Sequence, residues 1–212
     1  MIVLGVSIPF AFGTAMVYYY FILGGSPATT VSVGFSQLNS LVLLAIPMFV
    51  IAGGVIEKGR LGEALVNFID MFVGHIKGGL GAVSVITSAI FGAITGSCAA
   101  CLSCIGSIMY PKLRKAGYDE GFATALLVNA GPLGLLIPPS ADQILYAWSA
   151  GLSVLACFLS TVVPGLILAA LLCVINFIYA KKSSSVQITE KVKFFSSRGM
   201  QRTGVAIPAL LF

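Results

Sequence analysis

The chain contains three long stretches without a single charged side chain. Residues 1–56 lack Asp, Glu, Lys, Arg and His, and the uncharged runs 78–111 and 143–180 extend over 34 and 38 residues. About 20 apolar residues suffice to cross the hydrocarbon core of a bilayer, which is about 30 Å thick. A membrane β-barrel would show short alternating segments instead of continuous apolar runs. The sequence therefore predicts an all-α polytopic membrane protein.

Composition and charge agree with this class. Of the 212 residues 58% are apolar and only 9% are charged, whereas about a quarter of the residues in a soluble domain are charged. The net charge of +5 does not indicate a nucleic-acid partner, because the 12 Lys and Arg residues are scattered among the ends of apolar segments. Basic residues at such places are typical of the cytoplasmic side of a membrane protein.

All 12 basic residues fall outside five apolar segments, which are Met1–Leu23, Leu41–Ile56, Gly78–Pro111, Gly121–Ala150 and Val154–Ala180. We interpret residues 1–56 as two scaffold-type spans joined by an external, uncharged connection at 24–39. Residues 154–180 are predicted to form one transmembrane helix. The basic linker 181–202 is expected on the cytoplasmic side, and residues 203–212 are expected to begin a further span.

The run 78–111 is predicted to enter and leave the membrane on the same side. A single crossing would put Lys112 opposite Lys77 and divide the basic residues between the two faces. As a helix, 34 residues would measure about 50 Å, which is too long for one upright span and too short for two. We therefore expect a re-entrant helical hairpin with its tip at Thr95-Gly96-Ser97. A strongly tilted single span is the alternative.

A second irregularity interrupts the apolar segment 121–150. Gly131-Pro132 and Pro138-Pro139 remove backbone donors and disfavour helix at the preceding residues. Bare backbone at membrane depth is tolerated only where it is buried in protein or lines a wet cavity. A broken transmembrane helix beside a hairpin tip therefore indicates a binding site near the membrane midplane, as in secondary transporters. A simple proline kink is the alternative.

The segment 57–77 has the pattern of an amphipathic helix. Apolar residues recur at helical spacing, with Glu63, Asn67 and Asp70 on other faces. We expect it to lie at the membrane interface on the cytoplasmic side.

The two irregular segments carry groups suited to ions. Hydroxyls and carbonyls at Thr95-Gly96-Ser97 would suit a hard cation such as sodium, although Gly92 and Gly96 also form a small-residue packing pair. Carbonyls freed by the prolines favour a cation, and amides at the start of the next half-helix favour an anion. Asp142 is the one charged residue inside the apolar segments, which makes it a functional candidate.

Catalysis has little support in the sequence. Cys98, Cys101 and Cys104 resemble the start of an iron–sulfur ligand run, but a fourth cysteine at the expected spacing is missing. The chain has one histidine, His75, so a histidine-rich metal site or a serine–histidine pair is not expected. We predict that the protein is not an enzyme and uses no cofactor.

Several motifs together resemble the large membrane subunit of tripartite ATP-independent periplasmic (TRAP) transporters. They cover nearly the whole chain, in order, as Leu44–Gly53, Gly74–Leu80, Phe91–Ser97, Gly117–Ala123, Gly134–Ser140 and Val163–Leu166. The match is to the N-terminal half of that subunit.

The resemblance implies one inverted-repeat half of an elevator-type, sodium-coupled transporter in the bacterial inner membrane. Such a transporter imports organic acid anions, including dicarboxylates, which a periplasmic solute-binding protein delivers. The implied partners are that binding protein, a small TRAP membrane subunit and the C-terminal half of the large subunit. Sodium is the coupling ion.

The resemblance also assigns residues to the two ligands. It implies a sodium site at Thr95, Ser97, Asn129 and Gly131, and substrate contacts at Gly96, Pro139 and Ser140. We expect Asp142 to stand beside the site without touching the substrate, held by backbone amides of its own helical turn.

This sequence departs from the family pattern at a few places, which leaves other functions open. Cys101 stands where many members have Asp or Thr, and Ala141-Asp142-Gln143 follows the prolines where many members are apolar. One alternative is a non-transporting truncated or assembly subunit. Another is one half of a different cation-coupled anion transporter.

Overall fold

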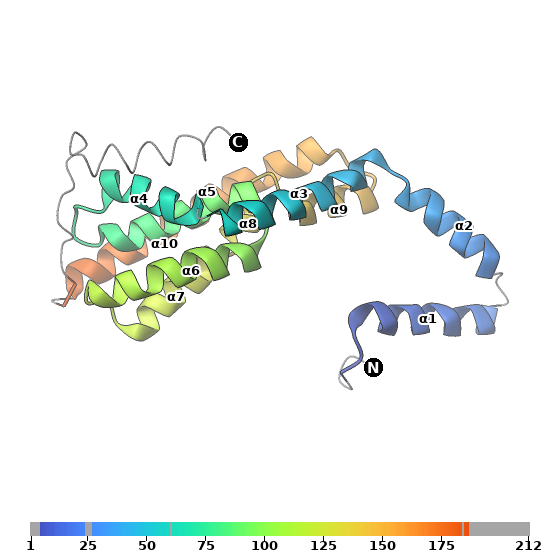
Figure 1. Ribbon diagram of the computed structural model, residues 1–212, viewed down its shortest axis with the longest axis horizontal. Helices are drawn as coiled ribbons and strands as arrows, with labels where there is room; N and C mark the ends of the chain where they lie inside the picture. The colour runs from blue at the N-terminus through green and yellow to red at the C-terminus, as the bar shows by residue number, and fades with distance from the viewer. Residues whose placement is uncertain (1–4, 24–26, 60, 184, 187–212) are drawn as a thin grey trace. The chain divides into compact units, whose positions relative to one another are not determined.

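The computed structural model describes residues 5–23, 27–59, 61–183 and 185–186, and shows a helical protein (Figure 1). No strand occurs among these residues. The helices are α1 (Ile8–Leu23), α2 (Pro27–Leu38), α3 (Leu41–Lys58), α4 (Leu61–Val73), α5 (Gly79–Thr95), α6 (Cys98–Lys115), α7 (Glu120–Ala130), α8 (Leu133–Leu136), α9 (Ala141–Ser149) and α10 (Val154–Lys182). The helical class predicted from the uncharged runs is confirmed.

The chain divides into two compact units, residues 1–43 and 44–212. The first unit holds α1, α2 and the start of α3. Helix α2 fills most of the stretch that the sequence suggested as a plain connection. Its residues Val31, Val33, Phe35 and Leu38 are exposed, as are most apolar side chains of α1.

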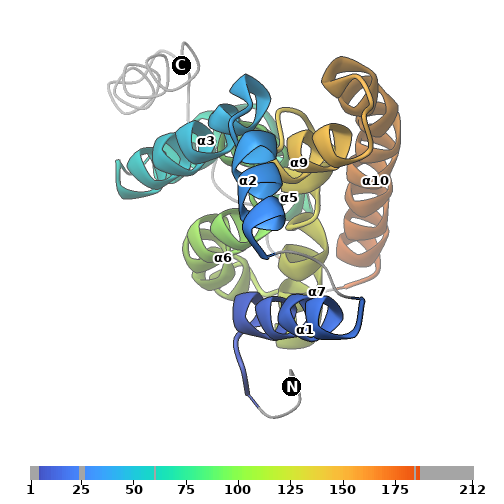
Figure 2. The same ribbon diagram turned by 90° about the vertical axis from the view of Figure 1, so that its right-hand side faces the viewer.

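The second unit is built around α5. Helices α4, α6, α7, α8 and α10 all contact α5. Figure 2 shows α5 between α6 and α10. The core therefore follows α5 along its length and includes Val83, Val85 and Phe91, which are fully buried.

Helices α5 and α6 form an antiparallel hairpin whose turn lies at Gly96 and Ser97, within the stretch proposed for the tip. Gly96 ends α5 in the left-handed conformation with φ 62°, and its N–H donates to the Gly92 carbonyl. Ser97 then begins α6, and its hydroxyl accepts from the Ala100 N–H at 3.4 Å. Helix α6 continues through Pro111 to Lys115, beyond the boundary that the sequence suggested. Passage of this hairpin in and out of a membrane stays a prediction.

The broken helix has one main interruption. Backbone hydrogen bonds continue past Gly131 and Pro132, because the N–H of Gly131 donates to the Leu127 carbonyl and that of Leu136 donates to the Pro132 carbonyl. The helix is interrupted at residues 137–140, and the segments on either side differ in direction by 47°. The Pro138-Pro139 peptide bond within this break is cis. The break is thus shorter than the Asn129–Ser140 stretch implicated by the sequence.

Helix α4 is amphipathic, and its apolar face packs against α5 and α6. Leu65, Val66 and Ile69 are buried there, and Gly62 lies close to Cys104 of α6. Protein, rather than lipid, therefore covers much of the apolar face of this helix. Its location at a membrane surface stays a prediction.

Helix α10 alone, within the described part of the chain, is long and apolar enough to cross a bilayer by itself. By length and composition the number of candidate spans rises to three if each of two bent helix pairs counts as one. These pairs are Val31–Leu38 with Leu41–Ile56, and Glu120–Leu136 with Ala141–Ser149. Most of the basic linker and all of residues 203–212 lie outside the described residues.

One end of the second unit gathers the start of α5, the α6–α7 turn and the end of α10. The Lys77 ammonium donates to the Ser183 carbonyl at 2.9 Å, and the Ser185 hydroxyl donates to the Gly117 carbonyl at 2.9 Å. We call this the basic end, because the Lys and Arg residues whose side chains are described lie there, namely Lys77, Lys112, Arg114, Lys115, Lys181 and Lys182.

Candidate transport site

The tip of the hairpin touches the break in the helix. A Cβ atom placed on Gly96 would lie 3.1 Å from the Pro139 carbonyl oxygen, 3.3 Å from the Ser140 Cα and 3.3 Å from the Ala141 nitrogen. Gly96 also has a positive φ of 62°. Glycine is thus required here both by the backbone conformation and by the close approach. The three residues proposed to contact the substrate, Gly96, Pro139 and Ser140, lie together.

Two further glycines bring the hairpin and the broken helix into backbone contact. A Cβ on Gly92 of α5 would lie 2.2 Å from the Cα of Gly134 in α8, and one on Gly134 would lie 3.2 Å from the Ser97 carbonyl oxygen. A Cβ on Gly131 would lie 3.1 Å from the Cys98 sulfur. The stretch from Gly131 to Gly134 therefore lies directly against the hairpin tip.

The start of α9 presents free hydrogen-bond donors beside this contact. The first intrahelical bond there runs from the Ile144 N–H to the Ser140 carbonyl, so the preceding amides have no partner within the helix. Ser140 is fully buried, its hydroxyl does not cap α9, and its oxygen has no hydrogen-bond partner among the described residues. Unpartnered buried hydroxyls are uncommon because each costs about 1–3 kcal/mol. This arrangement is suited to an anionic ligand.

The end of α8 presents the opposite chemistry. In a continuous helix the carbonyls of Gly134 and Leu135 would accept from residues 138 and 139, but both are prolines and have no N–H. The Leu135 carbonyl instead accepts from the Gln143 side-chain amide of α9. No hydrogen bond to the Gly134 carbonyl occurs within the described residues. Carbonyl oxygens of this kind are suited to a hard cation.

The residues assigned to sodium are placed unequally. Thr95 is buried, donates its hydroxyl to the Phe91 carbonyl at 3.1 Å and lies close to Gly53 of α3. Ser97 and Gly131 lie at the contact between tip and break. Asn129 is exposed on α7, and its side-chain amide donates to the Ala125 carbonyl at 2.8 Å. The structure thus brings Ser97 and Gly131 near the contact, while Asn129 bonds within its own helix.

Asp142 occupies the first turn of α9 and is exposed. The amides of that turn do not hydrogen-bond its carboxylate in the described structure, contrary to the arrangement expected from the sequence. A carboxylate there still benefits from the positive end of the helix dipole.

Other charged groups lie away from the contact between tip and break. The described Lys and Arg side chains belong to the basic end, at the start of the hairpin and the end of α10. No cluster of three or more His, Cys, Asp or Glu residues suited to a metal ion occurs in the part of the chain that the structure describes. Backbone dipoles and hydroxyls, with Asp142 and Gln143 in the first turn of α9, are the polar groups at this contact.

An apolar cavity of about 730 Å³ lies beside the break, between α3, α5 and α10. Its lining includes Phe49, Ile90, Ile94, Ile137, Pro139 and Leu166, and every lining residue is apolar. A carboxylate transferred into such surroundings would lose its hydration without compensation. The candidate ion site is therefore the contact between tip and break and not this cavity.

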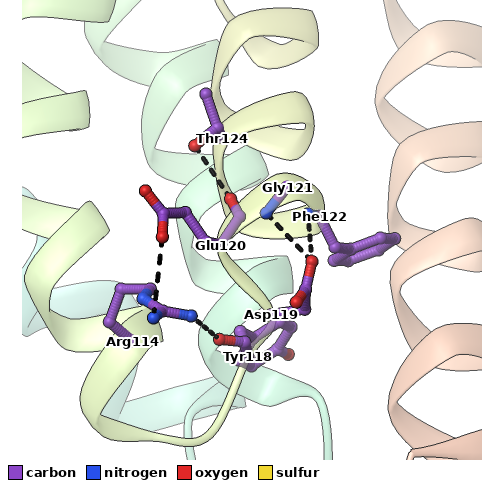
Figure 3. A network of polar contacts seen from close by, with 7 residues as sticks. All are labelled: Arg114, Tyr118, Asp119, Glu120, Gly121, Phe122 and Thr124. Carbon is purple, nitrogen blue, oxygen red and sulfur yellow. Dashed lines mark hydrogen bonds and ion pairs between the residues drawn. The ribbon is translucent and has the colours of Figure 1, made fainter.

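The turn between α6 and α7 fixes the hairpin to the broken helix at the basic end (Figure 3). Asp119 caps α7, because its carboxylate accepts from the N–H groups of Gly121 at 2.9 Å and Phe122 at 3.3 Å. The Arg114 guanidinium donates to the Tyr118 carbonyl at 2.9 Å and lies 3.9 Å from the Glu120 carboxylate. That ion pair is solvent-exposed and contributes at most about 1 kcal/mol.

Comparison with protein families identifies the chain. The model for the DctM component of tripartite ATP-independent periplasmic transporters matches residues 1–212. The chain belongs to this family. The resemblance found in the sequence motifs is thus confirmed, and members of the family are transporter permeases rather than enzymes.

Individual relatives carry the same family name with different substrates. The chain is 31% identical over 191 residues to the ectoine TRAP transporter large permease protein TeaC of Halomonas elongata, covering 85% of this chain and 43% of that protein. It is 37% identical over 147 residues to the C4-dicarboxylate permease DctM of Pseudomonas aeruginosa, covering 69% of this chain and 34% of that protein. The isethionate permease DctMQ of Oleidesulfovibrio alaskensis is 33% identical, with 85% of this chain and 29% of that protein covered. The chain therefore spans less than half the length of these relatives.

Proposed function

We propose that this DctM-family chain forms one half of a sodium-coupled permease that imports organic acid anions across the bacterial inner membrane. The observation that carries the proposal is the contact between the hairpin tip at Gly96 and the break at Pro139 and Ser140. Two helix ends rich in carbonyls and two helix starts rich in amides meet there, at the ends of α5 and α8 and the starts of α6 and α9.

The cation would bind on the carbonyl side of this contact. Thr95, Ser97, Asn129 and Gly131 remain our proposed sodium ligands. We add the Gly134 carbonyl, because Gly134 packs against Ser97 and Pro138 cannot donate the helical hydrogen bond to it. Sodium would supply positive charge at the contact between tip and break, which lies far from the basic side chains. An anion could then be held there without an arginine.

The anion would bind on the amide side. The buried Ser140 hydroxyl and the free amides at the start of α9 would hold a carboxylate or sulfonate oxygen, close to Gly96 and Pro139. The names of the relatives favour organic acids or zwitterions of similar size, including dicarboxylates.

The dimensions of the second unit are compatible with a site within the membrane. Gly165 of α10 packs against Leu136 and Ile137 at the break, and about 26 Å of helix separates it from Lys182. The 17-residue helix α5 spans a similar distance from the basic end to the tip. With the basic end in the cytoplasm, the tip would lie inside a hydrocarbon core about 30 Å thick.

Partners would complete the transporter. We propose a C-terminal half of the large permease, a small TRAP membrane subunit and a periplasmic solute-binding protein. Residues 1–212 by themselves are expected not to transport, because the C-terminal half of the permease would supply part of both the cation site and the anion site.

Uptake by the assembled transporter in proteoliposomes tests the function. An imposed inward sodium gradient should drive accumulation of succinate, ectoine or isethionate in the presence of the binding protein. Ser140→Ala should raise the half-saturating substrate concentration about three- to tenfold, because it removes one hydrogen bond from the anion. The matched control is Ser149→Ala, which removes an exposed hydroxyl of the same helix that donates to the Tyr146 carbonyl. Uptake that ignores sodium, or that this chain performs alone, would contradict the proposal.

A further inference from the structure

The side chain of Gln143 connects three helices at the break. Its Nε2 donates to the Leu135 carbonyl at the end of α8, and its Oε1 accepts from the Thr161 hydroxyl of α10 at 3.2 Å. Gln143 itself lies in the first turn of α9. The Leu135 oxygen can only accept, so it fixes the orientation of the amide with Nε2 toward α8 and Oε1 toward α10.

The bond to Leu135 replaces a hydrogen bond that proline removes. Pro138 and Pro139 together leave two carbonyls without helical donors, those of Gly134 and Leu135. Gln143 satisfies the second of them. The Gly134 carbonyl is the one left available, and Gly134 lies next to Ser97 at the hairpin tip.

The contact with Thr161 is the weaker of the two. The Thr161 hydroxyl also lies 3.0 Å from the Phe158 carbonyl and 3.4 Å from the Cys157 carbonyl of its own helix. A hydroxyl has one proton, so Gln143 competes with these backbone acceptors. Removing Thr161 should therefore disturb the break less than removing the amide of Gln143.

We propose that Gln143 is a positioning residue for cation binding. It holds α8, α9 and α10 in register across the break, so that the Gly134 carbonyl, which lacks a helical donor, is already positioned for sodium. This inference rests on the function proposed above. The side chain of Gln143 is not among the proposed sodium ligands or substrate contacts. The sequence indicated Gln143 only as a departure from the apolar pattern of related chains.

The test measures sodium and substrate dependence separately in the assembled transporter. Gln143→Met keeps the length of the side chain and removes both hydrogen bonds. It should raise the half-saturating sodium concentration about three- to tenfold, while the half-saturating substrate concentration at saturating sodium stays within about twofold. Thr161→Val should raise the half-saturating sodium concentration about two- to threefold. Thr161→Ser, which keeps the hydroxyl, should show the wild-type concentration. Ser160→Ala is the matched control, because that exposed hydroxyl donates only to the Cys157 carbonyl of its own helix.

Hydrogen–deuterium exchange on the same assembly separates this inference from the proposed function. Without sodium, Gln143→Met should increase deuterium uptake over residues 133–145 relative to the wild type, and Ser160→Ala should not. The positioning role would be overturned if Gln143→Met showed sodium-dependent uptake with an unchanged half-saturating sodium concentration and unchanged deuterium exchange. If Gln143→Met increases exchange but uptake by the wild-type assembly does not depend on sodium, the proposed function is overturned and the structural link of Gln143 stands. Should Gln143→Met fail to assemble, Thr161→Val applies the same test with its smaller expected shift.

Discussion

Asn176 of α10 donates its side-chain amide to the carbonyl of Gly78, the residue at which the hairpin begins, over 2.7 Å. The same side chain accepts from the Tyr118 hydroxyl at 3.0 Å. Asn176 is fully buried and lies so close to Gly81 that a Cβ there would fall 1.9 Å from its oxygen. One amide thus joins α10 to the start of α5 and to the α6–α7 turn.

Asn176→Leu should therefore destabilise the second unit strongly. The leucine would remove the acceptor of the buried Tyr118 hydroxyl proton, and a buried donor without an acceptor costs about 1–3 kcal/mol. It would also remove the shorter of two hydrogen bonds to the Gly78 carbonyl, which keeps only the bond from the Ala82 N–H at 3.3 Å. We expect a loss of about 2–5 kcal/mol, measured as chemical denaturation of the purified protein in detergent micelles. Ser160→Ala on the same helix should remain within about 0.5 kcal/mol of the wild type. Equal stability of the two variants would show that this amide has no structural role.

Tyr118 gives the same junction a dependence on alkaline pH. Burial raises the pKa of its hydroxyl from 10.0 to about 12, mainly through loss of hydration. The neutral form is therefore favoured in the folded state. Its stabilising contribution is complete below about pH 10 and is lost as the pH rises through about 12.

Tyr118→Phe should remove this alkaline sensitivity. The rise of the Tyr118 pKa from 10.0 to about 12 corresponds to about 2–3 kcal/mol. The wild type should therefore lose more stability than the variant between pH 10 and 12. Denaturation midpoints at pH 9 and 11.5 measure the difference. Tyr146→Phe, at an exposed position of α9, is the control and should follow the wild type. Parallel pH profiles for the wild type and Tyr118→Phe would contradict the prediction.

Gly92→Ala tests the backbone contact between the hairpin and the broken helix. The added Cβ would meet the Gly134 Cα at 2.2 Å, so one of the two helices must move. Overpacking of this kind costs about 1–3 kcal/mol, and the displacement should also weaken sodium binding. Gly106→Ala in α6 is the control, because its Cβ meets only Leu102 at 3.7 Å and alanine is the better helix former. A thermal midpoint for Gly92→Ala at or above that of the control would contradict the contact.

Lys77 and Lys112 should face the same side of the membrane. Helices α5 and α6 run antiparallel over 17 and 18 residues, which returns the chain to the end where it started. Lys77→Cys and Lys112→Cys, each in a cysteine-free background, should both be protected from an impermeant thiol reagent added to the periplasmic side. Labelling at 112 with protection at 77 would exclude the re-entrant arrangement.

The sequence located the main irregularities because prolines and glycines have local physical consequences. Pro138-Pro139 removes two backbone donors, and glycine at position 96 permits a left-handed turn, so both features could be found without tertiary information. Pro132 does not interrupt the helix, since it stands at the start of α8, where its missing N–H removes no bond that the helix needs. The extent of the break was therefore overestimated.

The features that the sequence did not predict depend on contacts between residues far apart in the chain. The bond from Gln143 to Leu135 and the contact of Gly92 with Gly134 join segments whose pairing the local sequence does not specify. Asn176 did carry a signal, because it is the one amide side chain in the apolar helix α10. Its partners, Gly78 and Tyr118, lie 98 and 58 residues away and could not be named in advance.

Asp142 provides the last test, because its role depends on whether it touches the substrate. A lipid-facing carboxylate would cost roughly 2.5–3.5 kcal/mol on insertion scales, so the exposed side chain in the first turn of α9 should face a wet cavity or a partner surface. A direct contact with an anionic substrate would be repulsive unless sodium, a proton or a cationic ligand group intervened. We therefore expect Asp142 to act beside the site, through the helix dipole that also supports the amides next to Ser140. Asp142→Asn in the assembled transporter should keep expression and most substrate affinity, and should alter sodium coupling or pH dependence only modestly. Loss of substrate binding at unchanged expression would instead make Asp142 a direct ligand.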